Sequence, residues 1–245
     1  FDSGVRRAFV HATDRETIVK HATRLLEPTV SSFVPPHSIE GYETTIGLGF
    51  DPQKARDEMT AAGWEDRDGD GLVENSSGDV FPVVEILYTT NTSRYKWIAL
   101  ELRDQWRRRL GVRVELRGTD NKFFSADLKS GNFMVARGRW YGDYGDPTTF
   151  LDVFRSNSGN NDRGFVNKEI DDALDMAALE QDPKKRMQML QKVEEQLFNK
   201  EVPMLVICQL LQLYMYEPES VSGLTTHPRL TQQLWRVQVK KQSQN

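Results

Sequence analysis

The chain has 245 residues, enough for one large domain or two small ones, and 38% of its residues are hydrophobic and 28% charged. Its 36 acidic and 32 basic side chains give a net charge of -4, which argues against a nucleic-acid-binding protein, because such proteins usually carry a basic excess. No apolar run reaches the roughly 20 residues that cross a bilayer, and the single cysteine permits no intrachain disulfide.

Helices and strands are predicted to alternate along the chain. The prediction rests on apolar spacing, capping residues and β-branched content. In chain order we expect two consecutive helical stretches over 5–26, with Asp14 as the N-cap of the second, and then a loop over 28–38 and a helix over 51–63. A strand over 82–90, a helix over 93–111, a strand over 112–118, a helix over 121–131 and a strand over 132–140 follow. The last elements are helices over 167–180 and 182–200 and strands over 202–210 and 232–240. This alternation is typical of an α/β protein with a largely parallel or mixed sheet.

Two of these helices carry clear signals at their ends. Asp51 is a suitable N-cap for the helix over 51–63, and Pro52 suits its first helical position. In the helix over 93–111, three consecutive arginines lie in the last turn before Gly111. Cations are favoured at a helix C-terminus and glycine just beyond it, so both signals agree on where this helix ends.

An acidic loop follows the helix over 51–63. Its Asp66, Asp68 and Asp70 have the spacing of positions 1, 3 and 5 of a calcium-binding EF-hand loop, and a glycine stands at position 6. Three neighbouring carboxylates repel one another unless a cation or solvent compensates. The spacing therefore makes these three aspartates candidate ligands of a structural calcium ion.

The rest of the loop departs from the EF-hand pattern. Position 12 is Ser77, which cannot replace the bidentate glutamate, although Glu74 or Asp79 could bind an ion instead. A strand, and not a second helix, is predicted downstream. The alternative is a helix-to-strand turn that uses aspartate and glycine for their backbone tolerance.

Motifs of common enzyme classes are missing from the sequence. It contains no HExxH zinc motif, no GxSxG nucleophile motif, no glycine-rich phosphate loop and no cluster of cysteine and histidine. We therefore expect a protein that is not an enzyme and that needs no cofactor apart from the possible calcium ion.

The segment RGRWYGDYGDPTTF, residues 137–150, is the best candidate for a binding site. It leaves the predicted strand over 132–140, and in an α/β sheet the loops at the carboxyl ends of strands line the ligand crevice. Trp140 and Tyr141 supply flat contact area, and Asp143 could pair with a ligand ammonium group. The alternative is a Gly/Asp turn in which Trp140 only packs inward.

Several segments, in this order, resemble one protein family. They are VRRAFVHATDRETIV, DPQKARDEMTAAGWEDRDGDGLVE, LRDQWRRRLGVRVELR, FMVARGRWYGDYGDPTTFL and VPMLVICQLLQLYMYEPESVSGL. Together they are similar to the C-terminal lobe of the dipeptide/oligopeptide/nickel-type periplasmic solute-binding proteins of ABC importers, the bacterial extracellular solute-binding protein family 5. The resemblance implies one lobe of a type II periplasmic-binding-protein-like α/β fold, with a mixed sheet flanked by helices.

The resemblance also implies how the chain is organised. Family members are about twice this length and have two lobes around a cleft. Residues 1–212 would form the C-terminal ligand-binding lobe, and residues 213–245 would be a crossover and terminal strand that pairs with the N-terminal lobe. Without that lobe we expect the fragment to self-associate through residues 213–245. The chain starts without a methionine or a signal peptide, so we expect it to be part of a longer protein.

Site residues follow from the resemblance one at a time. In peptide-binding relatives the aspartate at the position of Asp143 holds the ligand's α-amino group, and Trp140 and Tyr141 would line the same wall of the cleft. Arg137 matches an arginine of oligopeptide-binding members and would meet a ligand carboxylate or the hinge. Those members carry a tryptophan where this chain has Asn121.

The implied function is capture of a ligand for import. A peptide, or another small molecule such as a nickel chelate or a sugar, would be enclosed between the lobes by hinge closure and presented to ABC permease subunits in the membrane. The protein would then be periplasmic or extracellular. The alternative from another class is the ligand-sensing domain of a bacterial transcription regulator, in which a DNA-binding domain would precede this chain.

Overall fold

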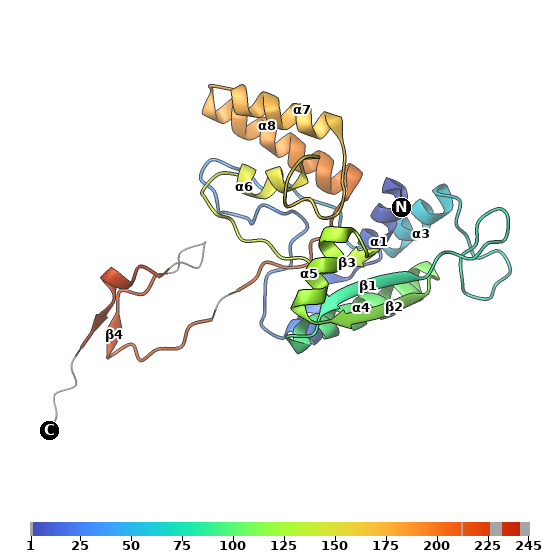
Figure 1. Cartoon of the computed structure of the whole chain (residues 1–245), viewed down its shortest axis with the longest axis horizontal. Helices are drawn as coiled ribbons and strands as arrows, with labels where there is room; N and C mark the ends of the chain where they lie inside the picture. Colours follow the sequence, from blue (N-terminus) through green and yellow to red (C-terminus); the bar gives the residue numbers. More distant parts are fainter. Residues whose placement is uncertain (1, 212, 226–231, 241–245) are drawn as a thin grey trace.

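The computed structural model describes residues 2–211, 213–225 and 232–240. Helices and strands alternate within it, which confirms the α/β class. The first 210 residues or so form a body of helices around a small sheet (Figure 1). The C-terminal segment, described over residues 213–225 and 232–240, extends away from that body. Among the described residues, no helix combines the length and the apolar character that crossing a lipid bilayer requires.

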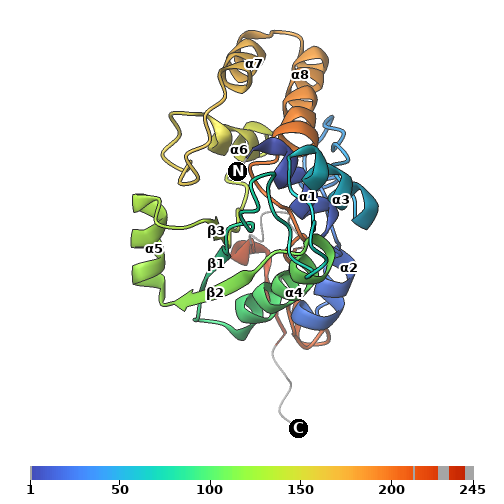
Figure 2. The same cartoon turned by 90° about the vertical axis from the view of Figure 1, so that its right-hand side faces the viewer.

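Three parallel strands form the sheet of the body. The central strand β1 (Val84–Thr89) pairs along its full length with β2 (Val114–Thr119), and on its other side it pairs with the short β3 (Val135–Ala136). The crossovers between them contain α4 (Ser93–Leu110) and α5 (Asn121–Ser130). The sheet lies between α5 on one side and α4 with the N-terminal helices on the other (Figure 2).

The remaining helices of the body form two groups. The N-terminal group comprises α1 (Ser3–His11), α2 (Arg15–Ile18), the π-helical turn η1 (Val19–Thr23) and α3 (Pro52–Ala61). The second group comprises α6 (Thr148–Leu151), the 3-10 turn η2 (Asp152–Phe154), α7 (Lys168–Leu179), α8 (Pro183–Glu195) and the π-helical turn η3 (Gln196–Glu201). Aspartate or asparagine caps the N-termini of α3, α7 and α8, and the cap of α3 is Asp51, as its sequence predicts.

Gly111 ends α4 as predicted, and it also anchors the acidic loop. Its φ of 62° lies in the left-handed region that favours glycine. A Cβ at this position would lie 2.8 Å from the carbonyl oxygen of Gly71, and the Gly111 carbonyl accepts a hydrogen bond from the Val73 amide. The acidic loop is therefore fastened to the C-terminus of α4.

Two hydrophobic cores hold the body together. The first lies between the sheet, α4 and the N-terminal helices, and includes Phe9, Phe81 and Trp106. Phe9 and Trp106 meet edge to face, with ring centroids 4.8 Å apart. The second lies among the helices of the second group, where Phe154 and Phe198 are almost completely buried.

An extended segment over residues 204–207 lies between the two cores and contributes to both. Met204 and Val206 pack against the second core, while Leu205 and Ile207 pack against the first. This alternation follows from the period of two of an extended chain. The Val206 carbonyl also accepts a hydrogen bond from Nε of the buried Arg15 (2.7 Å), and burial lowers the pKa of that guanidinium to about 10.

Three of the predicted strands are wrong in whole or in part. Residues 202–210 form no strand: the segment makes only an isolated antiparallel bridge, between Cys208 and Thr29. The strand predicted over 132–140 is reduced to β3. The strand predicted over 232–240 is reduced to the 3-10 turn η4 (Leu234–Arg236) and β5 (Gln238–Val239).

The C-terminal segment forms a two-stranded antiparallel ribbon of β4 (Val221–Ser222) and β5. Large apolar side chains are exposed along it, with Met215 98%, Trp235 79% and Val239 74% accessible. Residues 226–231 and 241–245, which belong to the predicted crossover and terminal strand, lie outside the described residues. The division at residue 212 stays a prediction.

Candidate ligand-binding site

The carboxyl ends of the three parallel strands meet at one edge of the sheet, where ligands of open α/β sheets bind. The loop over 138–146 leaves this edge directly after β3. At its start, the Arg137 amide donates a hydrogen bond to the Leu87 carbonyl (2.9 Å), which extends the β1–β3 pairing by one residue. The loop therefore starts from a position fixed by the sheet.

Arg137 is held between two aromatic rings. Its guanidinium lies 4.4 Å from the ring centroid of Tyr95 on α4 and 4.7 Å from that of Phe124 on α5. Burial lowers the pKa of Arg137 from its usual value, and its buried Nε has no hydrogen-bond partner among the described residues. The side chain connects the two crossover helices across the sheet edge.

The two aromatic candidates differ in exposure. Trp140 packs against the second core and donates a hydrogen bond from Nε1 to the Thr149 carbonyl (2.7 Å), so its ring is half-buried, as the inward-packing alternative predicts. Tyr141 is 45% exposed, and the guanidinium of Arg139 lies 5.6 Å from its ring centroid. Trp140 fixes the loop, and Tyr141 offers a ring at the surface.

Asp143 is exposed near the tip of the loop. Its amide donates a hydrogen bond to Oγ1 of the buried Thr149 (2.9 Å). The preceding residue, Gly142, lies so close to the Phe150 ring that a Cβ there would be 3.0 Å from a ring carbon. The backbone that carries the Asp143 carboxylate is therefore seated against the start of α6.

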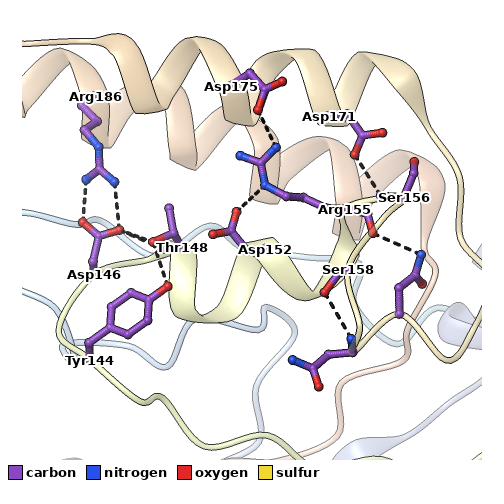
Figure 3. Close-up of polar contacts among 12 residues, drawn as sticks. Tyr144, Asp146, Thr148, Asp152, Arg155, Ser156, Ser158, Asp171, Asp175 and Arg186 are labelled. Carbon is purple, nitrogen blue, oxygen red and sulfur yellow. Dashed lines mark hydrogen bonds and ion pairs between the residues drawn. The ribbon is translucent and has the colours of Figure 1, made fainter.

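The second aspartate of the motif, Asp146, joins the loop to α8. Its carboxylate forms two hydrogen bonds with the Arg186 guanidinium (2.5 and 3.0 Å) and accepts two more from the amide and hydroxyl of Thr148 (Figure 3). Burial alone would raise the pKa of this carboxyl, but the hydrogen bonds from Arg186 and Thr148 outweigh it and hold the pKa below its usual value. Tyr144, 47% exposed, is also in contact with the Thr148 hydroxyl (Figure 3).

Asn121 lies at the same sheet edge, because it is the first residue of α5 and follows β2. Its side chain is exposed, and Asp120 serves as the N-cap. Phe123, two residues further along α5, is 60% exposed and was not singled out from the sequence. A phenylalanine three residues after an N-cap aspartate, on a helix that follows a strand end, was the signal available for it.

The acidic loop brings four carboxylates together away from this edge. Ligand atoms of Asp66, Asp68, Asp70 and Glu74 all lie within 4.8 Å of one another, and Glu74 is buried. Each of the four accepts a hydrogen bond from a backbone amide of the loop, for example Gly69 to Asp66 at 2.8 Å. These bonds are the ones that the turn alternative requires, and calcium binding stays a prediction of the spacing.

The known proteins compared with this chain are binding proteins for solutes or peptides. Residues 1–162 match the family described as bacterial extracellular solute-binding proteins, family 5 Middle. The chain is 33% identical over 193 residues to the oligopeptide-binding protein OppA of Bacillus subtilis (strain 168), a match that covers 78% of this chain and 34% of that protein. It is 29% identical over 232 residues to the dipeptide-binding protein DppE of the same organism, covering 93% of this chain and 40% of that protein.

Solved structures agree on the fold. The crystal structure of a periplasmic oligopeptide-binding protein, OppAIV of Borrelia burgdorferi, superposes with a TM-score of 0.80 at 24% identity and covers 97% of this chain and 45% of that chain. The likeness confirms the periplasmic-binding-protein-like α/β architecture. This chain thus spans less than half the length of the relatives that it matches.

Proposed function

The chain belongs to the bacterial extracellular solute-binding proteins of family 5, and from this premise we propose that it forms one wall of a peptide-binding cleft in the substrate-binding component of an ABC importer. The observation that carries the proposal is the loop over 138–146, which presents the exposed Asp143 carboxylate and the Tyr141 ring at the carboxyl edge of a parallel sheet. The two relatives compared by sequence are named for binding oligopeptides and dipeptides.

The mechanism that we propose is capture without chemistry. Asp143 pairs with the α-amino group of a peptide, and Tyr141 packs against its backbone or side chains. Arg137 and Asn121 complete this wall, with Arg137 aimed at a ligand carboxylate or at the hinge. A second lobe, which this chain does not include, closes over the ligand by hinge bending, and the closed form meets the permease subunits outside the cytoplasmic membrane. None of the relatives compared is a transcription regulator, so we prefer the importer to a sensor domain.

Replacing Asp143 with alanine tests the anchor in a protein that carries both lobes. We expect the affinity for free-amine peptides to fall about 30-fold, because a charge-assisted hydrogen bond contributes roughly 2 kcal/mol. Isothermal titration calorimetry with a pool of free-amine pentapeptides and the same pool N-acetylated provides the measurement. The acetylated pool should bind the parent protein weakly, and its affinity should fall little further in the variant.

Asp104→Ala, an exposed aspartate toward the far end of α4, is the matched control and should leave the affinity unchanged. If Asp143→Ala binds free-amine peptides as tightly as the parent protein does, Asp143 is not the anchor.

We also propose that the exposed apolar residues of the C-terminal segment are covered by the first lobe in the longer protein, and by another copy when this chain is alone. We expect sedimentation equilibrium at micromolar concentration to give a mass above that of one chain, because such apolar area is rarely left exposed on a monomer. Met215→Ser combined with Trp235→Ser should restore the monomer. The exposed Met176 on α7 gives the control, Met176→Ser. A monomeric parent chain whose C-terminal segment resists proteolysis would contradict the proposal.

A further inference from the structure

Thr149 makes contacts with two residues of the proposed ligand loop at once. Its carbonyl oxygen accepts the hydrogen bond from Trp140 Nε1 (2.7 Å), and its hydroxyl oxygen accepts the one from the Asp143 amide (2.9 Å). Thr149 is only 4% exposed, so both bonds are shielded from competing water. A single buried residue thus connects the inward-packing ring of the loop with the backbone of its exposed carboxylate.

The position of Thr149 is itself fixed by neighbouring contacts. It lies in the first turn of α6, and its amide donates to the Asp146 carbonyl (3.2 Å). The Asp146 carboxylate caps the same turn through the Thr148 amide (3.0 Å) and is held by both terminal nitrogens of Arg186 on α8 (Figure 3). A two-point pair between a planar guanidinium and a carboxylate fixes direction as well as distance. The contacts of Asp146 with Thr148 and Arg186 thereby fix the turn that carries the Thr149 hydroxyl.

The loop itself needs such support. It contains glycines at 138, 142 and 145, and a Cβ at Gly138 or Gly145 would meet no atom within 4 Å. Glycine has more accessible backbone conformations than any other residue, so ordering this loop costs more conformational entropy than ordering a typical segment. Contacts that restrict Asp143 before a ligand arrives reduce the conformational entropy that is lost when the ligand binds.

We infer that Thr149 is a positioning residue of the ligand site: its hydroxyl oxygen holds the Asp143 backbone, so that the carboxylate is already in place when a peptide ammonium group arrives. The inference rests on the proposed function for the role of Asp143. The hydrogen bond from the Asp143 amide to the Thr149 hydroxyl is present in the ligand-free chain, so it can be tested without a ligand. Serine keeps the oxygen that accepts the bond, whereas valine keeps the shape and burial of threonine without an acceptor.

Hydrogen exchange on the ligand-free chain tests the positioning directly. In Thr149→Val we expect the Asp143 amide to exchange about tenfold faster than in the parent chain, because the loss of one hydrogen bond of ordinary strength corresponds to roughly that factor. In Thr149→Ser its exchange should stay within about twofold. The Thr90 amide, which donates to the Thr119 carbonyl (2.8 Å) at the same sheet edge, is the internal reference and should be unchanged in both. Equal exchange of the Asp143 amide in all three proteins would overturn the inference.

Binding by the two-lobed protein separates the inference from the function on which it rests. With the pool of free-amine pentapeptides as probe, Thr149→Val should weaken binding about five- to tenfold, and Thr149→Ser should bind as the parent protein does. If Asp143→Ala weakens binding but Thr149→Val does not, the positioning role is wrong and the proposed function stands. If the parent protein binds no peptide from the pool, the proposed function fails, and the exchange measurement still decides whether Thr149 orders Asp143.

Discussion

Replacing Glu194 with alanine is expected to lower the free energy of unfolding by about 4 kcal/mol. Glu194 on α8 is fully buried, and its two carboxylate oxygens accept hydrogen bonds from the segment over 33–45. Oε1 accepts the amides of Phe33 (3.0 Å) and Val34 (2.8 Å), and Oε2 accepts the Tyr42 hydroxyl (2.7 Å). Alanine leaves these donors buried without a partner, at a cost of roughly 1–3 kcal/mol each before the surroundings relax. Urea denaturation followed by circular dichroism gives the free energy.

Two further variants make this prediction specific. Glu195→Ala changes the next residue of the same helix, which is exposed, and should shift stability by less than about 0.5 kcal/mol. Glu194→Gln keeps an oxygen for the two amides and places an NH2 group beside the Tyr42 hydroxyl, which can accept from it, so we expect a loss of about 1–2 kcal/mol. Equal stability of Glu194→Ala and Glu195→Ala would show that the segment does not depend on this carboxylate. Burial and the neighbouring Glu194 raise the pKa of Tyr42 above its usual value, which favours the protonated hydroxyl that donates to Glu194.

Gly47→Ala should be the second large effect, with a loss of about 3 kcal/mol. A Cβ at residue 47 would lie 2.0 Å from the carbonyl oxygen of Ser31 and 2.9 Å from its carbonyl carbon, and backbone cannot move away as a flexible side chain can. The Gly47 amide also donates to the Ser31 hydroxyl (3.0 Å), so any shift breaks that bond as well. Overpacking of this kind typically costs roughly 1–3 kcal/mol, and the lost hydrogen bond adds to it.

Gly49→Ala provides the control for this variant, since a Cβ there meets no atom within 4 Å. We expect it to stay within about 0.5 kcal/mol of the parent chain in the same denaturation experiment. If Gly47→Ala is as stable as Gly49→Ala, the backbone at residue 47 can move away from the Ser31 carbonyl at no cost in stability.

Local signals in the sequence were sufficient to predict most helices and to identify the segment that carries the candidate site. The Asp51 N-cap of α3 and the terminator Gly111 of α4 depend on residues within one turn, and each is where the sequence predicts it. Trp140, Tyr141 and Asp143 lie on one loop because they are neighbours in the chain. The sequence could thus indicate which segment leaves the sheet edge, and the structure confirms that it does.

What the sequence could not show depends on contacts between distant residues. The support of the loop comes from Arg186, which is 40 positions from its partner Asp146, and the ring stack on Arg137 comes from Tyr95 and Phe124 on two different helices. No periodicity links such residues. The segment over 202–210 shows a related difficulty, because its β-branched apolar content predicts a strand, whereas residues 204–207 pack alternately against two cores.

The segment over 204–207 also has a consequence for how the protein is made. Successive residues of this segment belong to different cores, so each core lacks part of its wall until the whole segment is present. During synthesis the chain emerges from its N-terminus, and domains fold as units once their residues are available. Neither core is complete while residue 207 is still inside the ribosome, although all the strands of the sheet have emerged by then. Apolar surface of both cores then stays open to chaperones, or to export as an unfolded chain, until this segment has emerged.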